Sequence, residues 1–137
     1  MRKRISVLPS TFLYLACLLL ILPVQWIGAM ITAALFHEVG HLVVLKLFRI
    51  PILHIRIGII GTVIETGAML PKQEIFCALA GPLAGIALAA VARSMPMLLF
   101  CALGQTAFNL LPFPRSDGGR VLRCILQNII PERQLRG

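Results

Sequence analysis

The pattern with the clearest chemical meaning in this sequence is formed by His37, Glu38 and His41, inside an otherwise apolar stretch. An α-helix advances about 100° per residue, so side chains four positions apart share a face, and two imidazoles there can bind one metal ion. Glu38 projects from the adjacent part of the helix surface, where its carboxylate can reach a water molecule without binding the metal. The pattern predicts metal-assisted hydrolysis with Glu38 as general base.

A hydrolytic zinc site needs a third protein ligand, because three side chains hold the metal and the fourth position is left to water. The chain has five acidic residues. Glu65 lies in a predicted hairpin, Glu74 at a predicted helix start where the dipole favours an anion, and Glu132 in a polar tail. Asp117 is the remaining candidate, with an Asp-Gly turn before a terminal helix as the alternative. The third histidine, His54, is expected at a surface.

Composition places these residues in a membrane protein. The chain is 58% hydrophobic and 13% charged, against roughly 25% charged in soluble domains, and its mean hydropathy is +0.91. Four apolar segments approach the roughly 17 to 25 residues that a spanning helix needs: residues 8–22, 25–47, 75–92 and 95–111. A His-Glu-x-x-His pattern can arise by chance in a soluble helix. In a spanning helix a charged group costs about 2.5 to 3.5 kcal/mol, which favours a functional cluster.

We therefore expect an α-helical integral membrane protein, with four transmembrane helices and a β-hairpin between the second and third, as a single domain over residues 1–137. The segment 48–73 is rich in β-branched residues, glycine and proline, which predicts the hairpin over residues 54–66. Its strands are expected at 54–60 and 62–66, with a break at Gly61, and a simple cytoplasmic loop is the alternative. Residues 118–130 predict an amphipathic interfacial helix.

The net charge of +8 does not indicate nucleic-acid binding, because Lys and Arg stand at the ends of apolar runs rather than on one soluble face. They are expected to set the topology beside a lipid bilayer, with both termini and the hairpin in the cytoplasm. The basic amino end and the following apolar run could also form a signal peptide. Because no small-x-small cleavage pattern follows, we interpret this run as a retained membrane anchor.

The sequence resembles the site-two protease family of intramembrane zinc metalloproteases, peptidase family M50, in a small form without extra regulatory domains. Three motifs carry the resemblance: His37-Glu38-Val39-Gly40-His41, Gly81-Pro82-Leu83-Ala84-Gly85, and the segment from Asn109 to Gly119. The resemblance implies that one zinc ion is bound by His37, His41 and Asp117. It also implies that Glu38 is the catalytic base and that Asn109 positions substrate or stabilises the oxyanion.

Two departures from the family pattern concern the substrate more than the metal. Gly85 stands where many members have asparagine, and Arg115 with Ser116 stands where an apolar pair is common. The resemblance implies membrane-tethered protein substrates, such as an anti-sigma factor or a sigma-factor precursor, in a bacterial cell membrane. Because a helical substrate must unwind before cleavage, residues 57–66 are expected to offer it a strand edge.

Three other functions remain to be weighed against the protease. A catalytically inactive relative could bind a membrane partner, but intact His37, Glu38, His41 and Asp117 argue against it. A metal-handling membrane protein is the second, because intramembrane histidines and acids also mark ion pathways. A soluble metalloprotease is the third, and the lengths of the apolar segments oppose it.

Overall fold

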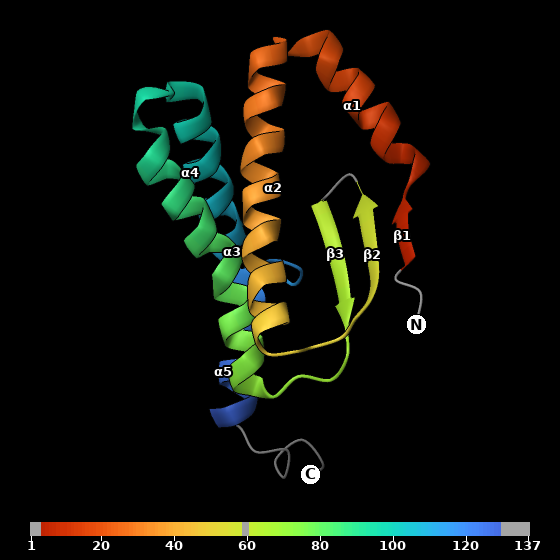
Figure 1. Cartoon of the computed structure of the whole chain (residues 1–137), viewed down its shortest axis with the longest axis vertical. Coiled ribbons are helices and arrows are strands. Elements are labelled where there is room, and N and C mark those ends of the chain that lie inside the picture. Colours follow the sequence, from red (N-terminus) through yellow and green to blue (C-terminus); the bar gives the residue numbers. More distant parts are fainter. Residues whose placement is uncertain (1–3, 59–60, 130–137) are drawn as a thin grey trace.

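The computed structural model describes residues 4–58 and 61–129, in which helices pack beside a small sheet (Figure 1). Along the chain the elements are β1 (Arg4–Val7), α1 (Pro9–Ile21), α2 (Val24–Leu47), β2 (Ile52–Gly58), β3 (Gly61–Thr66), α3 (Pro71–Val91), the short 3-10 helix η1 (Ala92–Ser94), α4 (Pro96–Leu110) and α5 (Asp117–Ile129).

The centre of the molecule is the bundle of α2, α3 and α4, with α5 packed against α3. Four buried apolar residues join the three helices: Ala33, Leu88, Ala89 and Ala102. Small side chains let the helix backbones approach closely, as in many membrane bundles. At Gly40, a Cβ would lie only 2.9 Å from the carbonyl carbon of Ala80. The contact between α2 and α3 is therefore made by backbone as well as by side chains.

The sheet has the order β1-β2-β3, with β1 parallel and β3 antiparallel to β2. The predicted hairpin is confirmed, and the alternative of a simple loop is wrong. The expected break at Gly61 is also wrong, because Gly61 belongs to β3 and pairs with Gly58. The last two residues of the expected first strand, 59–60, lie outside the described residues. The strand β1 was not expected, because four residues beside a basic terminus give only a weak local strand signal and their partner lies far along the chain.

Two helices are long and apolar enough to cross a membrane: Val24–Leu47 and Pro71–Ser94. The other two expected spans are shorter, with 13 residues in α1 and 15 in α4. At 1.5 Å per residue they extend about 20 and 22 Å, less than the roughly 30 Å hydrocarbon core. No residue of α1 is buried, and exposed large apolar side chains on α2 include Ile31, Leu35, Phe36, Val39 and Val43. An apolar exterior of this kind suits a lipid surrounding.

The ends of α2 and α4 each turn the chain sharply. Arg49, at φ 55°, ends α2 in the left-handed conformation common at helix C-termini, and the Ile50 N–H donates to the Leu45 carbonyl at 2.9 Å. The chain then turns into β2. The fourth helix ends at Leu110, just before Pro112 and Pro114. The loop after α4 leads into α5, which begins at Asp117. The terminal helix expected over residues 118–130 corresponds to α5, and its residue 130 lies outside the described residues.

Candidate metal centre

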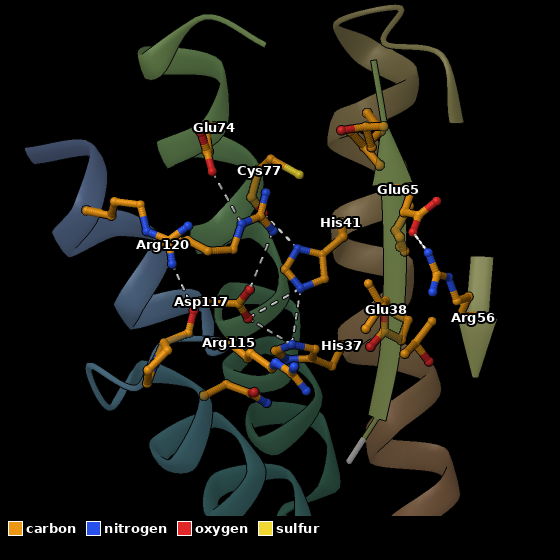
Figure 2. A pocket seen from close by; sticks show the side chains of 18 of the residues that line it. His37, Glu38, His41, Arg56, Glu65, Glu74, Cys77, Arg115, Asp117 and Arg120 are labelled. Atoms are coloured by element: carbon orange, nitrogen blue, oxygen red, sulfur yellow. Dashed lines mark hydrogen bonds and ion pairs between the residues drawn. The ribbon is translucent and has the colours of Figure 1, made fainter. Parts of the chain in front are cut away.

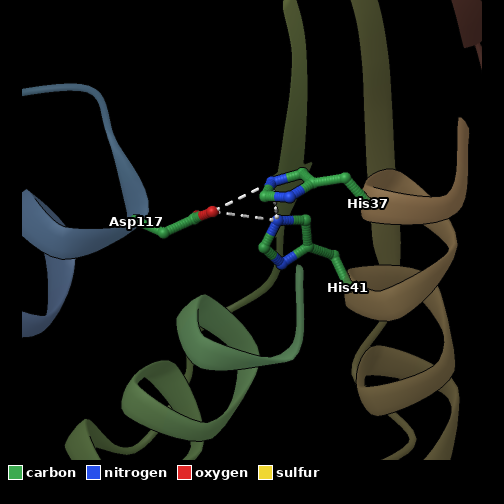
Figure 3. Close-up of side chains that lie close together, drawn as sticks. All are labelled: His37, His41 and Asp117. Atoms are coloured by element: carbon green, nitrogen blue, oxygen red, sulfur yellow. Dashed lines mark hydrogen bonds and ion pairs between the residues drawn. The ribbon is translucent and has the colours of Figure 1, made fainter. Parts of the chain in front are cut away.

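Three side chains from two distant segments converge in the interior (Figure 3). His37 and His41 lie one turn apart on α2, and Asp117 is the first residue of α5. Asp117 Oδ2 lies 3.0 Å from His37 Nε2 and 3.3 Å from His41 Nε2, and the two Nε2 atoms are 3.2 Å apart. The three residues expose only 4%, 6% and 7% of their surface. The predicted ligands therefore form one compact, buried group.

The spacing of these atoms fits a small metal ion. Tetrahedral zinc holds nitrogen and oxygen ligands at roughly 2.0 to 2.1 Å, which places neighbouring ligand atoms about 3.3 Å apart. The His41 Nδ1 atom lies 2.7 Å from the carbonyl oxygen of Cys77. Because a carbonyl only accepts hydrogen bonds, Nδ1 carries a proton, which leaves Nε2 as the nitrogen available to a metal ion. Two imidazoles and a carboxylate suit zinc well.

Both imidazole rings rest on Gly81 of α3. A Cβ at this position would lie 2.6 Å from His41 Cε1 and 2.7 Å from His37 Cε1, so any larger residue would push the rings away. Gly81 is therefore the surface of α3 that the rings of His37 and His41 contact. In the sequence, only the family-like motif Gly81-Pro82-Leu83-Ala84-Gly85 pointed to this part of α3.

Asp117 is placed by the serine before it. Ser116 Oγ accepts hydrogen bonds from the N–H groups of Phe113 and Gly119, each at 3.1 Å, and donates to the Leu111 carbonyl. Ser116 is thus the N-cap of α5. Burial alone would raise the pKa of the Asp117 carboxyl, but contacts with His37 and His41 lower that pKa to about 2. In the sequence, Ser116 was noted only as a departure from the family pattern, although serine is a common N-cap residue.

A cavity of about 610 Å³ opens beside the three residues (Figure 2). Glu38 lines it and is only partly buried. Asn109 also lines it, and its side-chain amide donates to the Gln105 carbonyl at 3.1 Å. Residues 62–66 of β3 form another wall. The third histidine, His54, is partly buried and bonds Ser6 Oγ at 2.8 Å, so it is not part of the metal centre.

No protein-family model matches the sequence, and no curated protein matches it significantly. Among solved structures, the chain is similar to the site-2 protease from Methanocaldococcus jannaschii, with a TM-score of 0.76 and 26% sequence identity. The similarity covers 93% of this chain and 69% of that one. This similarity supports the resemblance to the site-2 protease family. Together with the two long apolar helices, it supports a membrane protein of the metalloprotease class.

The structure explains why glycine, rather than the asparagine common in the site-2 protease family, stands at position 85. A Cβ at Gly85 would collide with Thr106 Oγ1 of α4. Thr106 is buried, and its hydroxyl has no hydrogen-bond partner among the described residues. The glycine therefore makes room for a threonine from the neighbouring helix. In this chain, position 85 serves the packing of α3 against α4.

Proposed function

We propose that this chain is an intramembrane zinc endopeptidase that cleaves within or near the membrane segment of membrane-tethered regulatory proteins. The observation that carries the proposal is the buried triangle of His37, His41 and Asp117, with edges of 3.0 to 3.3 Å, next to Glu38 in one cavity. A zinc ion held by these residues would polarise a peptide carbonyl and lower the pKa of water toward about 7.

The remaining chemistry belongs to side chains that line the cavity. Glu38 accepts a proton from the attacking water and later gives it to the leaving amine, as a general base and then a general acid. Asn109 can turn its amide N–H groups from the Gln105 carbonyl to the oxyanion of the substrate, where a donor stabilises developing charge. A charged base at this depth is consistent with a polar cavity rather than with a lipid-facing surface.

We assign substrate binding to β3. This strand stands at the edge of the sheet order, and Figure 1 shows it between β2 and α2. Residues 62–66 line the cavity that holds the metal ligands. An extended substrate segment adding to β3 would satisfy its own backbone groups there and reach the site unwound.

Cross-linking tests this assignment. Single cysteines placed along residues 61–66 are expected to cross-link to a model membrane-tethered substrate, whereas a cysteine at Ser94, in η1, is expected to give no product. Equal cross-linking at both places would contradict binding at β3.

For the cell, we propose a multi-pass protein of a bacterial membrane, with α1 and α4 completing four crossings and both termini in the cytoplasm. The substrate is a membrane-tethered regulator such as an anti-sigma factor or a sigma-factor precursor. These assignments rest on the distribution of basic residues and on the family resemblance.

Metal content and cleavage together test the function. The purified chain in detergent is expected to hold about one zinc ion and to cleave a model membrane-tethered substrate. Asp117→Ala removes one of three ligands, so zinc content and cleavage are both expected to fall. Glu38→Gln keeps the ligands and the size of the side chain but removes the base, so zinc is expected to remain while cleavage is lost.

Other outcomes would favour the competing functions. Stoichiometric zinc with cleavage that does not depend on Glu38 would contradict the proposed chemistry. Zinc binding without cleavage of any tested substrate would favour an inactive partner-binding relative. Release of zinc across a vesicle membrane would favour metal handling.

A further inference from the structure

The first turns of α3 support two of the metal ligands, although α3 supplies no ligand itself. The Cys77 carbonyl accepts from His41 Nδ1. One turn earlier, Glu74 Oε1 lies 3.6 Å from Arg120 Nε, and Arg120 Nη1 lies 4.0 Å from Asp117 Oδ1 (Figure 2). Ligands from α2 and α5 are thus each connected to the same short stretch of α3.

The two oxygens of Asp117 face different partners. Oδ2 faces the two imidazoles, and Oδ1 faces the guanidinium of Arg120. The two oxygens of a carboxylate are equivalent, so a half-turn restores the same arrangement, whereas a smaller rotation takes one oxygen away from the cation and the other away from the imidazoles. A cation beside one oxygen therefore favours the orientation in which the other oxygen faces the metal position.

Arg120 is itself held in place. Its position one turn after Asp117 on α5 brings the guanidinium near the carboxylate, and Glu74 attracts it from α3. The Glu74 and Arg120 side chains are 33% and 30% exposed, so the pair lies at the rim of the cavity. Glu74 also lies beside Cys124, whose thiol pKa is raised first by burial and then by this carboxylate.

We propose that Arg120, held by Glu74, is a positioning residue that fixes the Asp117 carboxylate for metal binding. This inference rests on the proposed metal site and adds the residues that orient its third ligand. Loss of an outer partner of a metal ligand typically weakens metal binding about 10- to 100-fold. The effect is expected on retention of zinc, and it does not require a known substrate.

Zinc competition with a chelator, and the rate of zinc release into excess chelator, test the proposal on the full chain in detergent. Arg120→Gln is expected to weaken zinc binding about 10- to 100-fold, and Glu74→Gln to weaken it less. The double variant is expected to be no weaker than Arg120→Gln, because Glu74 acts through Arg120. Arg56→Gln is the matched control: it breaks the ion pair with Glu65 on the hairpin, at the same cavity, and should leave zinc binding unchanged.

A charge exchange separates positioning from simple attachment of α5 to α3. Combining Glu74→Arg with Arg120→Glu restores an attractive pair between the helices but places a carboxylate beside Asp117. Thermal stability in detergent is expected to recover relative to either single reversal, while zinc release remains fast. Recovery of both properties would overturn the proposal, because the pair would then act only as a packing contact.

The remaining outcomes are also decisive. Unchanged zinc release in Arg120→Gln, with zinc bound to the native chain, would overturn this inference and leave the proposed protease intact. Equal losses in Arg120→Gln and Arg56→Gln would overturn it too, because the effect would then come from the total charge of the cavity. Absence of zinc binding by the native chain would overturn the metal site and this inference together.

Discussion

One hydroxyl determines where the third ligand stands. Ser116 Oγ accepts hydrogen bonds from two backbone N–H groups and donates one to a carbonyl of the loop after α4. The same hydroxyl therefore stabilises this loop and caps the N-terminus of α5. The two glycines after Asp117 are also constrained. A Cβ at Gly118 would lie 2.9 Å from the Leu111 carbonyl oxygen, and a Cβ at Gly119 would overlap the Phe113 carbonyl. At the scale of single residues, the metal centre depends on the groups around Asp117 as much as on the carboxylate.

Replacing this hydroxyl should therefore affect both stability and metal binding. Ser116→Ala removes the N-cap, which typically costs about 0.5 to 2 kcal/mol of stability, and it frees the loop that orients Asp117. We expect a lower free energy of unfolding in detergent and several-fold weaker zinc binding, measured by chelator competition; Ser116→Thr should retain most of both. Ser6→Ala, which removes the bond to His54 far from the site, is the control. Native zinc affinity in Ser116→Ala would show that the cap does not position the ligand.

The residues of the candidate site differ in how readily they can be recognised from the sequence. His37 and His41 could be proposed as a pair directly, because a spacing of four residues within one helix has a known geometry. Asp117 required elimination among five acids and the family resemblance, because its approach to α2 depends on how two distant elements pack. The cap at Ser116 becomes meaningful only when the path of its loop is known.

At the scale of elements, the site depends on the close packing of α3 against α2. Both ligand rings contact Gly81, whereas a Cβ added at Gly104 on α4 would have nothing within 4 Å. The two glycines occupy helices of the same bundle but differ in surroundings. They provide a matched comparison between a glycine required for space and one that is not.

Alanine at these two positions should have opposite effects. Gly81→Ala is expected to displace the imidazole rings and to reduce zinc binding strongly, with lower thermal stability. Gly104→Ala meets no neighbour and removes the conformational freedom of a helical glycine, so a stability gain of roughly 0.5 to 1 kcal/mol is expected with zinc binding unchanged. Zinc titration and thermal unfolding in detergent measure both effects. Native zinc binding in Gly81→Ala would contradict the close contact.

The elements themselves were predicted where the signal is local. The expected segments 25–47 and 75–92 correspond closely to α2 and α3, because their apolar length is a property of the sequence alone. The helix α1 is shorter than the apolar run around it, since Pro9 opens it and Pro23 follows it. Strand β1 could not be predicted, because only its pairing with β2 makes those four residues a strand.

At the scale of the whole molecule, charge is distributed unevenly between two ends. The turn from α3 to α4 contains Arg93, whereas the opposite ends of the helices and the loops beside them contain Lys46, Arg49, Lys72, Arg115, Arg120 and Arg123. Figure 1 shows the turn between α3 and α4 at the same end as the junction of α1 with α2, and α5 at the other end. His37 lies ten residues before the end of α2, about 15 Å along the axis. From the positive-inside rule we expect the basic end to face the cytoplasm, with the metal centre about 15 Å from the cytoplasmic end of α2.

Labelling of single cysteines from each side of the membrane tests this placement. In a chain whose four cysteines are replaced by alanine, Ser94→Cys in η1 should react with a membrane-impermeant maleimide added to intact cells. Ala68→Cys, in the segment between β3 and α3, should react only in inverted vesicles, because α3 crosses the bilayer between the two positions and both side chains are exposed. The cysteine-free parent, checked for bound zinc, is the control for folding and for background labelling. Reaction of both cysteines from the same side would show that α3 does not span the membrane, and reaction from exchanged sides would show that the basic end faces outward.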